Sequence, residues 1–576
     1  MDATKALPIS ETDVLVVGAG PTGLTMAAEL ATRGVGCRII DKAPARSQHT
    51  RALVVQARSL ELMQKMGIAD ELVARGRRTL KATPFVGGRR AVDVEFGDIG
   101  VDDTPYPFLL FVSQAETERV LEEHLEDLGV KVERPVELLT FEEYAEGVST
   151  RLRHGDGREE NVRARYIVGA DGAHSVVRHT TGLSFEGDAY PQNFMLADVE
   201  IDWEGDKDRL YFFLSRKGLL VVFPLAGPSS YRLITTRVEY TPPDAGDPTL
   251  EEFQQLTTEL SALPMKLHDP GWLARFRLHH RGVNSYRAGR AFVAGDAAHI
   301  HSPAGGQGMN TGIQDAYNLA WKLALVLEGR TPNSFLDSYH EERYPVGRRL
   351  LRTTDQLFNV AATHNPVLIR LRNFLLPWIL PRVMSKRSLR ARAFRFVSQL
   401  GIKYPGSSTV GEELGGADRT FRSGPAAAGH RAPDAPLRLV GESRQTSLFS
   451  RLRETPHHLL LFGGWGSDAD GWEASDAELR ALIAEYEGLL EPHLIVAGES
   501  IRVGAEIPVY LDERGLAHER YGLRGAGLYL IRPDGYVAFR APGTNLQPLQ
   551  TYLQRVFPSR SLERQETHGR SGASSS

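Results

Sequence analysis

Short apolar runs alternate with helix-forming segments at the start of the chain. Residues 12–17 (Thr-Asp-Val-Leu-Val-Val) are nearly all apolar, as expected of a strand buried in a parallel sheet. The glycine-rich residues 18–23 follow, and then residues 24–31, which are rich in helix formers. A second apolar run at residues 37–40 ends at Asp41. This order predicts a strand, a tight turn, a helix and a second strand.

The residues of this turn suit a dinucleotide-binding site. Gly18 would make the tight turn, Gly20 would let the backbone approach a pyrophosphate, and Gly23 would let helix and strand pack closely. Pro21 stands near the helix start, where a missing N–H costs little, and the free N–H groups there can face phosphates. Asp41 could accept hydrogen bonds from a ribose diol. A glycine pattern alone is weak evidence, but strand, glycines, helix, second strand and acid in register are strong evidence.

A similar pattern downstream indicates which dinucleotide binds. Residues 290–296 predict a buried strand that ends in Gly-Asp, and a glycine-rich loop at residues 304–312 leads into an amphipathic helix at 313–328. The acid, Asp296, could bind the ribityl hydroxyls of a flavin, and N–H groups of the loop could face the pyrimidine carbonyl of its ring. A nicotinamide dinucleotide would not need this second loop, so the pattern favours FAD.

Between these motifs, at residues 166–178, lies another strand-to-helix turn with Asp171 and Gly172 at its apex, so along the chain it is the second motif and the pattern at 290–312 is the third. In this order the three motifs resemble the fingerprints of the class A flavoprotein monooxygenases. That family includes para-hydroxybenzoate hydroxylase, phenol hydroxylase and several polyketide hydroxylases. The resemblance covers at least residues 12–350 and includes Tyr-His-Glu-Glu-Arg-Tyr-Pro at residues 339–345.

The resemblance implies a set of cofactor-binding residues. For the ADP half of FAD they are Gly18, Gly20, Gly23, Asp41 and Arg51, with Lys42 beside them; for the ribityl-phosphate region, Gln114 and Asp296; and against the isoalloxazine ring, Pro303, Gly308, Met309 and Asn310. Asp171 would serve FAD packing and nicotinamide binding. A role of Asp171 as a helix cap alone is the alternative.

Alternating apolar and polar positions mark the middle of the chain. Between about residues 190 and 285, four runs have the period-two pattern of strands with one apolar face: 194–201, 209–214, 219–223 and 231–236. In the family such a sheet walls the substrate pocket. The candidate substrate residues are Tyr211, Phe213, Phe223 and Arg232, and for each of them plain core or surface is the alternative.

The motifs identify no catalytic side chain. A phenol hydroxylase would be expected to carry an acid between Arg51 and Arg58, and residues 52–57 contain none, so simple phenol is a poor candidate substrate. His299 and His301 lie close to the flavin loop in the sequence. For these two, packing or hydrogen bonding is as good an interpretation as proton transfer.

Beyond residue 350 the sequence predicts helices, a linker and a further domain. The most apolar stretch, residues 373–381, contains two prolines and is too short to span a bilayer. We expect it to be buried in a helical connector, with peripheral membrane contact as the alternative. Strands expected at 458–462, 494–497 and 527–540 resemble the thioredoxin-like C-terminal domain of phenol hydroxylase and its relatives. The tail from Arg560 is expected to be disordered.

Composition narrows the possible functions. The net charge of −4 and the pI near 6.5 give no reason to expect nucleic acid as a partner. Cys37 is the only cysteine, which excludes an internal disulfide, a redox pair and a cysteine-rich metal site; we expect no metal. The thioredoxin-like domain is therefore expected to pack or dimerise. The N-terminus lacks the apolar run of a secretory signal, and we expect no transmembrane segment and a cytoplasmic location.

Together these features predict an α/β, multi-domain (α+β) fold. The expected parts are a Rossmann-type FAD-binding domain at 10–185 and 286–350, an inserted, mostly antiparallel β-sheet substrate domain at 186–285, a helical connector at 351–405, a thioredoxin-like domain without redox cysteines at 406–560, and a tail at 561–576.

The predicted function is that of an FAD-dependent monooxygenase. NADPH or NADH would reduce FAD, and a flavin hydroperoxide formed with O2 would hydroxylate an aromatic small molecule, phenolic or polyketide-like. A Baeyer–Villiger or epoxidising oxygenase on the same fold remains an alternative, as does a non-catalytic flavin-binding partner protein. A flavin halogenase is disfavoured because no Trp-x-Trp-x-Ile-Pro segment occurs. A homodimer is one use that the C-terminal domain could have.

Overall fold

The computed structural model describes most of the chain. The described residues are 9–47, 52–79, 81–95, 99–226, 230–237, 246–301, 305–361, 363, 365–413, 426–453, 456–463, 472, 476–497 and 507–558. Two of the predicted cofactor residues, Arg51 and Pro303, lie outside these residues, as does the tail at 561–576.

The first sheet has the parallel strands that the apolar runs predict. β1 (Ile9–Val17) lies between β2 (Cys37–Ile40) and β12 (Glu159–Gly169), and β12 pairs in turn with β19 (Ala291–Val293), all in parallel. Parallel strands end at the same edge of a sheet, so the turns after these four strands meet there. All three sequence motifs are therefore brought to one edge. The sheet is completed by β9 (Val132–Glu133), β10 (Val136–Tyr144), β11 (Gly147–His154) and β18 (Arg287–Ala288).

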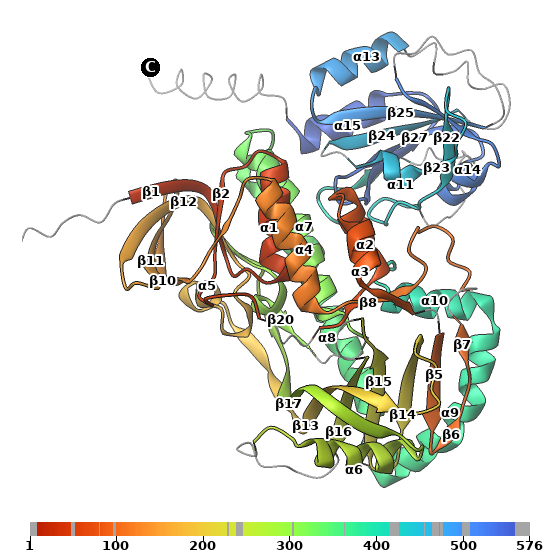
Figure 1. Ribbon diagram of the computed structural model, residues 1–576. Coiled ribbons are helices and arrows are strands. Elements are labelled where there is room, and N and C mark those ends of the chain that lie inside the picture. The colour runs from red at the N-terminus through yellow and green to blue at the C-terminus, as the bar shows by residue number, and fades with distance from the viewer. Residues whose placement is uncertain are drawn as a thin grey trace, which may run out of the picture.

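Three helices, α1 (Pro21–Thr32), α4 (Gln114–Asp127) and α7 (Gly308–Leu327), stand side by side against this sheet (Figure 1). Most of α7 is buried, because its apolar residues pack on α1 while other elements cover its remaining faces. The shorter elements of this part are α2 (Ala57–Lys65), α3 (Ala69–Arg75), α5 (Val176–Thr180) and a small sheet of β3 (Val54–Val55), β8 (Leu109–Phe111) and β4 (Arg77–Thr79).

The second sheet contains the four strands predicted from the period-two pattern. They are β13 (Phe185–Asp202), β14 (Arg209–Leu214), β15 (Gly218–Pro224) and β16 (Tyr231–Arg237), joined by β17 (Lys266–Val283) and β20 (His299–Ile300). The sheet also takes in β5 (Lys81–Val86), β6 (Arg89–Arg90) and β7 (Val94–Glu95), and β5 pairs in parallel with β14. Residues 81–95, which the sequence analysis assigned to the first domain, thus cross over to the second sheet. The helix α6 (Leu250–Ser261) covers one face of this sheet (Figure 1).

The connector consists of three helices, α8 (Asp337–Ala361), α9 (Pro366–Ser385) and α10 (Arg387–Val397). The expected burial of residues 373–381 is wrong, because α9 runs along the outside of the molecule and Phe374 and Trp378 are 68% and 61% exposed. Pro377 and Pro381 lie inside α9. None of the helices in the described ranges combines the length and the apolar character that crossing a bilayer would require.

The C-terminal domain is an eight-stranded sheet in the order β21-β28-β27-β24-β25-β26-β22-β23. Its strands are β21 (Gly411–Glu412), β22 (Pro436–Leu439), β23 (Thr446–Ser447), β24 (His457–Gly463), β25 (Leu490–Ala497), β26 (Val509–Asp512), β27 (Ala526–Ile531) and β28 (Val537–Pro542), and its helices α11 (Leu448–Arg451), α13 (Asp476–Glu485), α14 (Leu516–Tyr521) and α15 (Gln547–Val556). Parallel β24, β25 and β26 precede an antiparallel β27–β28 hairpin, and the strands predicted at 458–462, 494–497 and 527–540 correspond to β24, β25, β27 and β28. The predicted α/β multi-domain class is confirmed.

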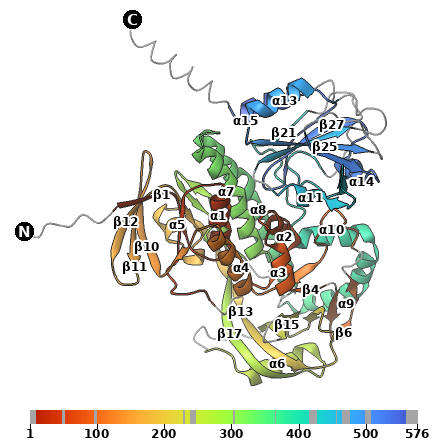
Figure 2. The same ribbon diagram turned by 45° about the horizontal axis from the view of Figure 1, so that its top comes forward.

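Buried charges join this domain to the first one. Glu342 of α8 binds Arg532 of the β27–β28 turn through both carboxylate oxygens, at 2.6 and 2.8 Å, and also accepts from Lys322 of α7 at 2.9 Å. Arg532 also binds Asp534, so two cations face two anions in an interior from which water is excluded. Burial lowers the pKa of Lys322 to about 8, although Glu342 opposes this. Figure 2 shows the C-terminal domain seated beside α7 and α2.

Candidate active site

The first glycine turn is shaped by close packing at two positions and by open space at the third. Gly18 has φ +101°, and a Cβ there would lie 2.4 Å from the carbonyl oxygen of Ala170. A Cβ on Gly23 would lie 1.8 Å from the carbonyl oxygen of Gly18. A Cβ on Gly20, in contrast, would meet no described atom within 4 Å. The backbone at Gly20 therefore faces space that a ligand can approach closely.

Two helix N-termini meet at this edge of the sheet. A Cβ on Gly312, in the first turns of α7, would lie 2.3 Å from Thr22 Oγ1 in the first turn of α1. A Cβ on Gly295 would lie 2.5 Å from the same hydroxyl. No side chain in the described ranges caps the start of α1 or of α7. Their free N–H groups and positive dipole ends form a site suited to an anionic ligand such as a pyrophosphate.

Asp41 is fixed at the end of β2 by the turn itself. Its Oδ2 accepts the N–H of Ala19 at 2.7 Å, and its Oδ1 accepts the N–H of Ala43 at 2.8 Å. Each carboxylate oxygen can accept a second hydrogen bond, so the acid can hold the glycine turn and still receive a ribose hydroxyl. Lys42 is exposed beside it. Gln114, at the start of α4, donates to Glu118 at 2.8 Å.

Asp171 contacts the start of α5, whose cap is Ser175. Its Oδ2 accepts the N–H of Val176, the first residue of α5, at 2.7 Å. Its Oδ1 is buried and has no hydrogen-bond partner among the described residues, and burial raises the pKa of this carboxyl. A buried acceptor without a partner is costly, which leaves Oδ1 ready for a donor from a ligand. The contact with α5 is thus seen directly, and the coenzyme role stays a prediction.

Arg178 links the second motif to the third. Its guanidinium donates to the carbonyl oxygen of Ala297 at 2.9 Å and to that of Ala173 at 2.7 Å, and it is 2% exposed. The turn at Asp171 is thereby tied to the turn that carries Asp296, whose side chain is exposed. In the sequence, Arg178 is the last residue of the motif at 166–178, and nothing there indicates a role for it. A basic residue buried between two predicted turns carries no local signal.

A buried carboxylate, Asp315 of α7, holds the third motif. Its Oδ2 accepts the N–H of Gly295 at 3.1 Å and lies 2.8 Å from His299 Nε2, while its Oδ1 accepts from Arg343 Nε at 2.6 Å. Burial pushes the pKa of Asp315 up, but Arg343 and His299 outweigh it and hold the pKa below its usual range. His299 therefore serves hydrogen bonding inside the protein, the first of its two interpretations.

The segment at residues 339–345 braces the same region from α8. Arg343 also donates to the carbonyl oxygen of Thr311 at 3.2 Å and to the hydroxyl of Tyr404 at 2.9 Å. Tyr339 donates to the carbonyl oxygen of Val293, the last residue of β19, at 3.0 Å. The resemblance singled out this segment, but its contacts with residues far away in the chain could not be read from the sequence.

Asn310 fastens the start of α7 to β3. Its Oδ1 accepts the N–H of Gln56 at 2.8 Å, and its Nδ2 donates to the carbonyl oxygens of Val54 at 2.8 Å and Gly306 at 2.9 Å. The side chain is fully buried, so it shapes the loop and its amide is occupied by protein. Gly308 and Met309 are half-buried beside it and remain the predicted contacts of the flavin ring.

Two of the four substrate candidates lie on the face of the second sheet that α6 covers. Side chains alternate between the two faces of a strand, and Tyr211 and Phe213 point to the face that α6 covers, where they pack with Phe253 and Leu256. They are core residues, which was the alternative for each. Phe223 points to the opposite face, and its ring centroid lies 5.8 Å from that of Phe111 in the first domain.

The face of the second sheet away from α6 is called the inner face. Arg232 lies there beside Phe223, its register partner on the neighbouring strand. It is 3% exposed and donates to both oxygens of Asp198, each at 2.7 Å. Its guanidinium lies 5.5 Å from the ring centroid of Trp272. Next to this pair, Phe194 and Phe276 stack with centroids 5.8 Å apart. The inner face therefore combines an aromatic wall with one neutralised charge pair.

The chain matches two family models. Residues 11–354 match an FAD binding domain, and residues 426–559 match the C-terminal domain of aromatic-ring hydroxylases. Together these matches cover the first two sheets and the C-terminal domain.

Several known proteins are similar over nearly the whole length. The chain is 36% identical to a 6-methylpretetramide 4-monooxygenase of Streptomyces rimosus, covering 94% of this chain and 93% of the relative. It is 34% identical to a pentachlorophenol 4-monooxygenase of Sphingobium chlorophenolicum, covering 92% and 93%. Among solved structures, an aklavinone-11 hydroxylase in complex with FAD and aklavinone superposes with a TM-score of 0.73 at 26% identity, covering 95% of this chain and 99% of that one.

A first prediction concerns Gly20. Replacing it with Ala adds a Cβ that meets no protein atom, so the free energy of unfolding of the FAD-free protein should change by less than about 1 kcal/mol. If a phosphate lies there, FAD binding should weaken at least about 10-fold, measured by flavin fluorescence titration. Gly246→Ala is the control, because its Cβ also meets no atom. Equal FAD affinity in the two variants would remove Gly20 from the site.

A second prediction concerns Arg343. Arg343→Met leaves Asp315 buried without its cation, and should lower the free energy of unfolding by about 3–5 kcal/mol in urea titrations. Arg349→Met, on the exposed side of the same helix, should change it by less than about 0.5 kcal/mol. Two variants of equal stability would show that the pair does not hold the third motif.

Proposed function

The chain belongs to the family of FAD-dependent aromatic-ring monooxygenases, and on that premise we propose that it hydroxylates a polyketide-type aromatic compound held against the inner face of the second sheet. The observation that carries the substrate proposal is the composition of this face. Aromatic residues recur on this face over several strands: Phe223 and Trp272 are half-buried, and Phe194 and Phe276 are buried. Residues 52–57 bring no acid to deprotonate a simple phenol. An extended ring system suits such a wall better than a single phenol ring.

FAD, when bound, supplies the redox chemistry, and the protein supplies binding, orientation and exclusion of water. We propose that the ADP half lies along Gly20 and Asp41, with the pyrophosphate on the N–H groups at the start of α1. The start of α7 would then present its N–H groups, at Gly308 and Met309, to the pyrimidine side of the flavin ring. The start of α7 is held in place by the buried contacts of Asn310 and Asp315, which keeps its donors pre-organised.

The reductant is proposed to be NADPH or NADH, and the oxidant O2. The unpartnered Oδ1 of Asp171, near the meeting point of the motifs, supports a coenzyme contact at that position. Arg232 is proposed to orient a polar group of the substrate while its charge stays balanced by Asp198. A neutral pair of this kind can offer hydrogen bonds to a phenol or quinone without placing net charge beside the ring.

Coenzyme oxidation tests this proposal. NADPH or NADH should be oxidised slowly by the enzyme alone and several-fold faster with a fitting aromatic ligand, with peroxide released when the ligand fits badly. Phe223→Leu, on the inner face, should raise the ligand concentration needed for half-maximal stimulation. Phe213→Leu, on the α6 face, should alter stability alone. Equal effects of the two variants on ligand response would contradict this placement of the substrate.

We also propose that two copies of the chain associate through α9. Its exposed apolar side chains recur at helical spacing and form one stripe: Val367, Leu368, Leu371, Phe374, Leu375, Trp378 and Ile379. A stripe of this size is unusual on a monomer. Light scattering should give the mass of a dimer for the wild type and of a monomer for Phe374→Ser with Trp378→Ser. A monomeric wild type that instead binds lipid vesicles through this stripe would overturn the proposal.

A further inference from the structure

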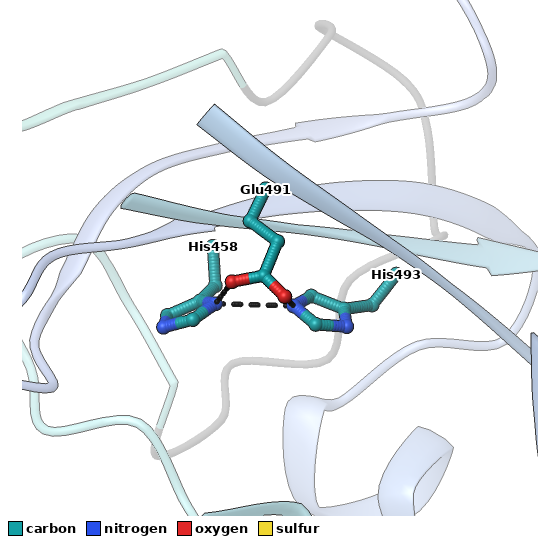
Figure 3. Close-up of side chains that lie close together, drawn as sticks. All are labelled: His458, Glu491 and His493. Atoms are coloured by element: carbon teal, nitrogen blue, oxygen red, sulfur yellow. Dashed lines mark hydrogen bonds and ion pairs between the residues drawn. The ribbon is translucent and has the colours of Figure 1, made fainter. Parts of the chain in front are cut away.

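A group of potential metal ligands lies in the C-terminal domain, far from the site described above. His458 on β24 and Glu491 on β25 are register partners on neighbouring parallel strands. His493 follows Glu491 by two residues, so its side chain points to the same face of the sheet. Figure 3 shows the three side chains directed toward one another. The two histidines are buried, and Glu491 is 31% exposed.

The distances within this group are those of ligands around one small ion. His458 Nδ1 lies 3.0 Å from His493 Nε2 and 3.2 Å from Glu491 Oε2, and His493 Nε2 lies 3.8 Å from Glu491 Oε1. Tetrahedral Zn²⁺ with metal–ligand bonds near 2.0–2.1 Å separates its ligand atoms by about 3.3 Å. An ion can therefore enter between these atoms with shifts of only a few tenths of an ångström.

We propose that His458, Glu491 and His493 bind one divalent transition-metal ion of the Zn²⁺ class. Two imidazoles and one carboxylate form a donor set that suits Zn²⁺ and its neighbours better than Ca²⁺ or Mg²⁺, which take oxygen ligands. The fourth position would hold water, which can enter past the partly exposed Glu491. The site leaves no local signal in the sequence, because its ligands come from two strands more than thirty residues apart and none is cysteine.

The contact between the two imidazoles also suits an ion. His458 Nδ1 and His493 Nε2 face each other at 3.0 Å, so without an ion one of these nitrogens must carry the proton of a hydrogen bond to the other. An ion between them would accept both lone pairs, and that proton would move to the outer nitrogen of its own ring.

One cation of the first domain opposes the ion. Lys65 of α2 acts electrostatically on His493, and its ammonium donates to the carbonyl oxygen of Leu452 in the C-terminal domain. Metal affinity should therefore depend on the contact between the two domains. Lys65→Met, which removes this charge, should bind the ion more tightly than the wild type.

The test uses the full-length, FAD-loaded protein after chelator treatment and dialysis. Calorimetric titration with Zn²⁺ should give one site per chain, and Co²⁺ should give the visible absorption of a four-coordinate ion at wavelengths beyond the flavin bands. Glu491→Gln should weaken Zn²⁺ binding at least about 10-fold, and His493→Gln should do the same. Glu491 is partly exposed, so its variant keeps the test valid if the buried histidine variant does not fold.

His457→Gln is the matched control. His457 is buried on the same strand but points to the other face, where it packs on Trp321 and Phe557. This variant should keep the Zn²⁺ affinity and the Co²⁺ spectrum of the wild type. The proposal is overturned if the wild type binds no ion, if Glu491→Gln binds as tightly as the wild type, or if the Co²⁺ spectrum is that of a fully hydrated, six-coordinate ion.

Discussion

The buried carboxylate of Asp315 is the interaction on which the candidate active site depends. It accepts hydrogen bonds from the N–H of Gly295 and the guanidinium of Arg343 and lies against the imidazole of His299. The side chains of Asp315, His299 and Arg343 are each exposed by 1% or less. Desolvation makes a lone carboxylate costly here, and its pairing with Arg343 offsets that cost. The pair joins the turn after β19, the N-terminal half of α7 and the N-terminal part of α8. These are the elements that carry the third motif.

A second buried pairing extends this arrangement to the C-terminal domain. Glu342 is the neighbour of Arg343 on α8, and it binds Lys322 of α7 and Arg532 of the β27–β28 turn. The helix α8 thus contacts the start of α7 through Arg343 and the C-terminal domain through Glu342. A thioredoxin-like fold without cysteine pairs has no exchange chemistry, and its contacts here are those of a support for α7. The same domain carries the His458, Glu491 and His493 group on its sheet.

Short-range sequence patterns predicted those elements of the fold that depend mainly on residues close together in the chain. The buried strands, the glycines that meet neighbouring backbone and the alternation of the second sheet all leave short-range signals, and β1, β2, β14 and α7 lie close to where the sequence placed them. Which face of β14 is covered by α6 cannot be read from the alternation, so the sequence could not distinguish Tyr211 and Phe213 as core residues from substrate-lining ones. The same holds for α9, whose apolar residues were expected inside. Arg178, Asp315 and Glu342 bind partners far along the chain, and no local pattern announces such pairs.

The proposed function requires that one atom of O2 is transferred to an aromatic ring of the substrate. Turnover under ¹⁸O2 with a polyketide-type aromatic that stimulates coenzyme oxidation measures this directly, with the product analysed by mass spectrometry. We expect one ¹⁸O atom in the product and none when ¹⁸O is supplied as water. A product that takes its oxygen from water, or coenzyme oxidation that yields only peroxide with every ligand that binds, would contradict the account.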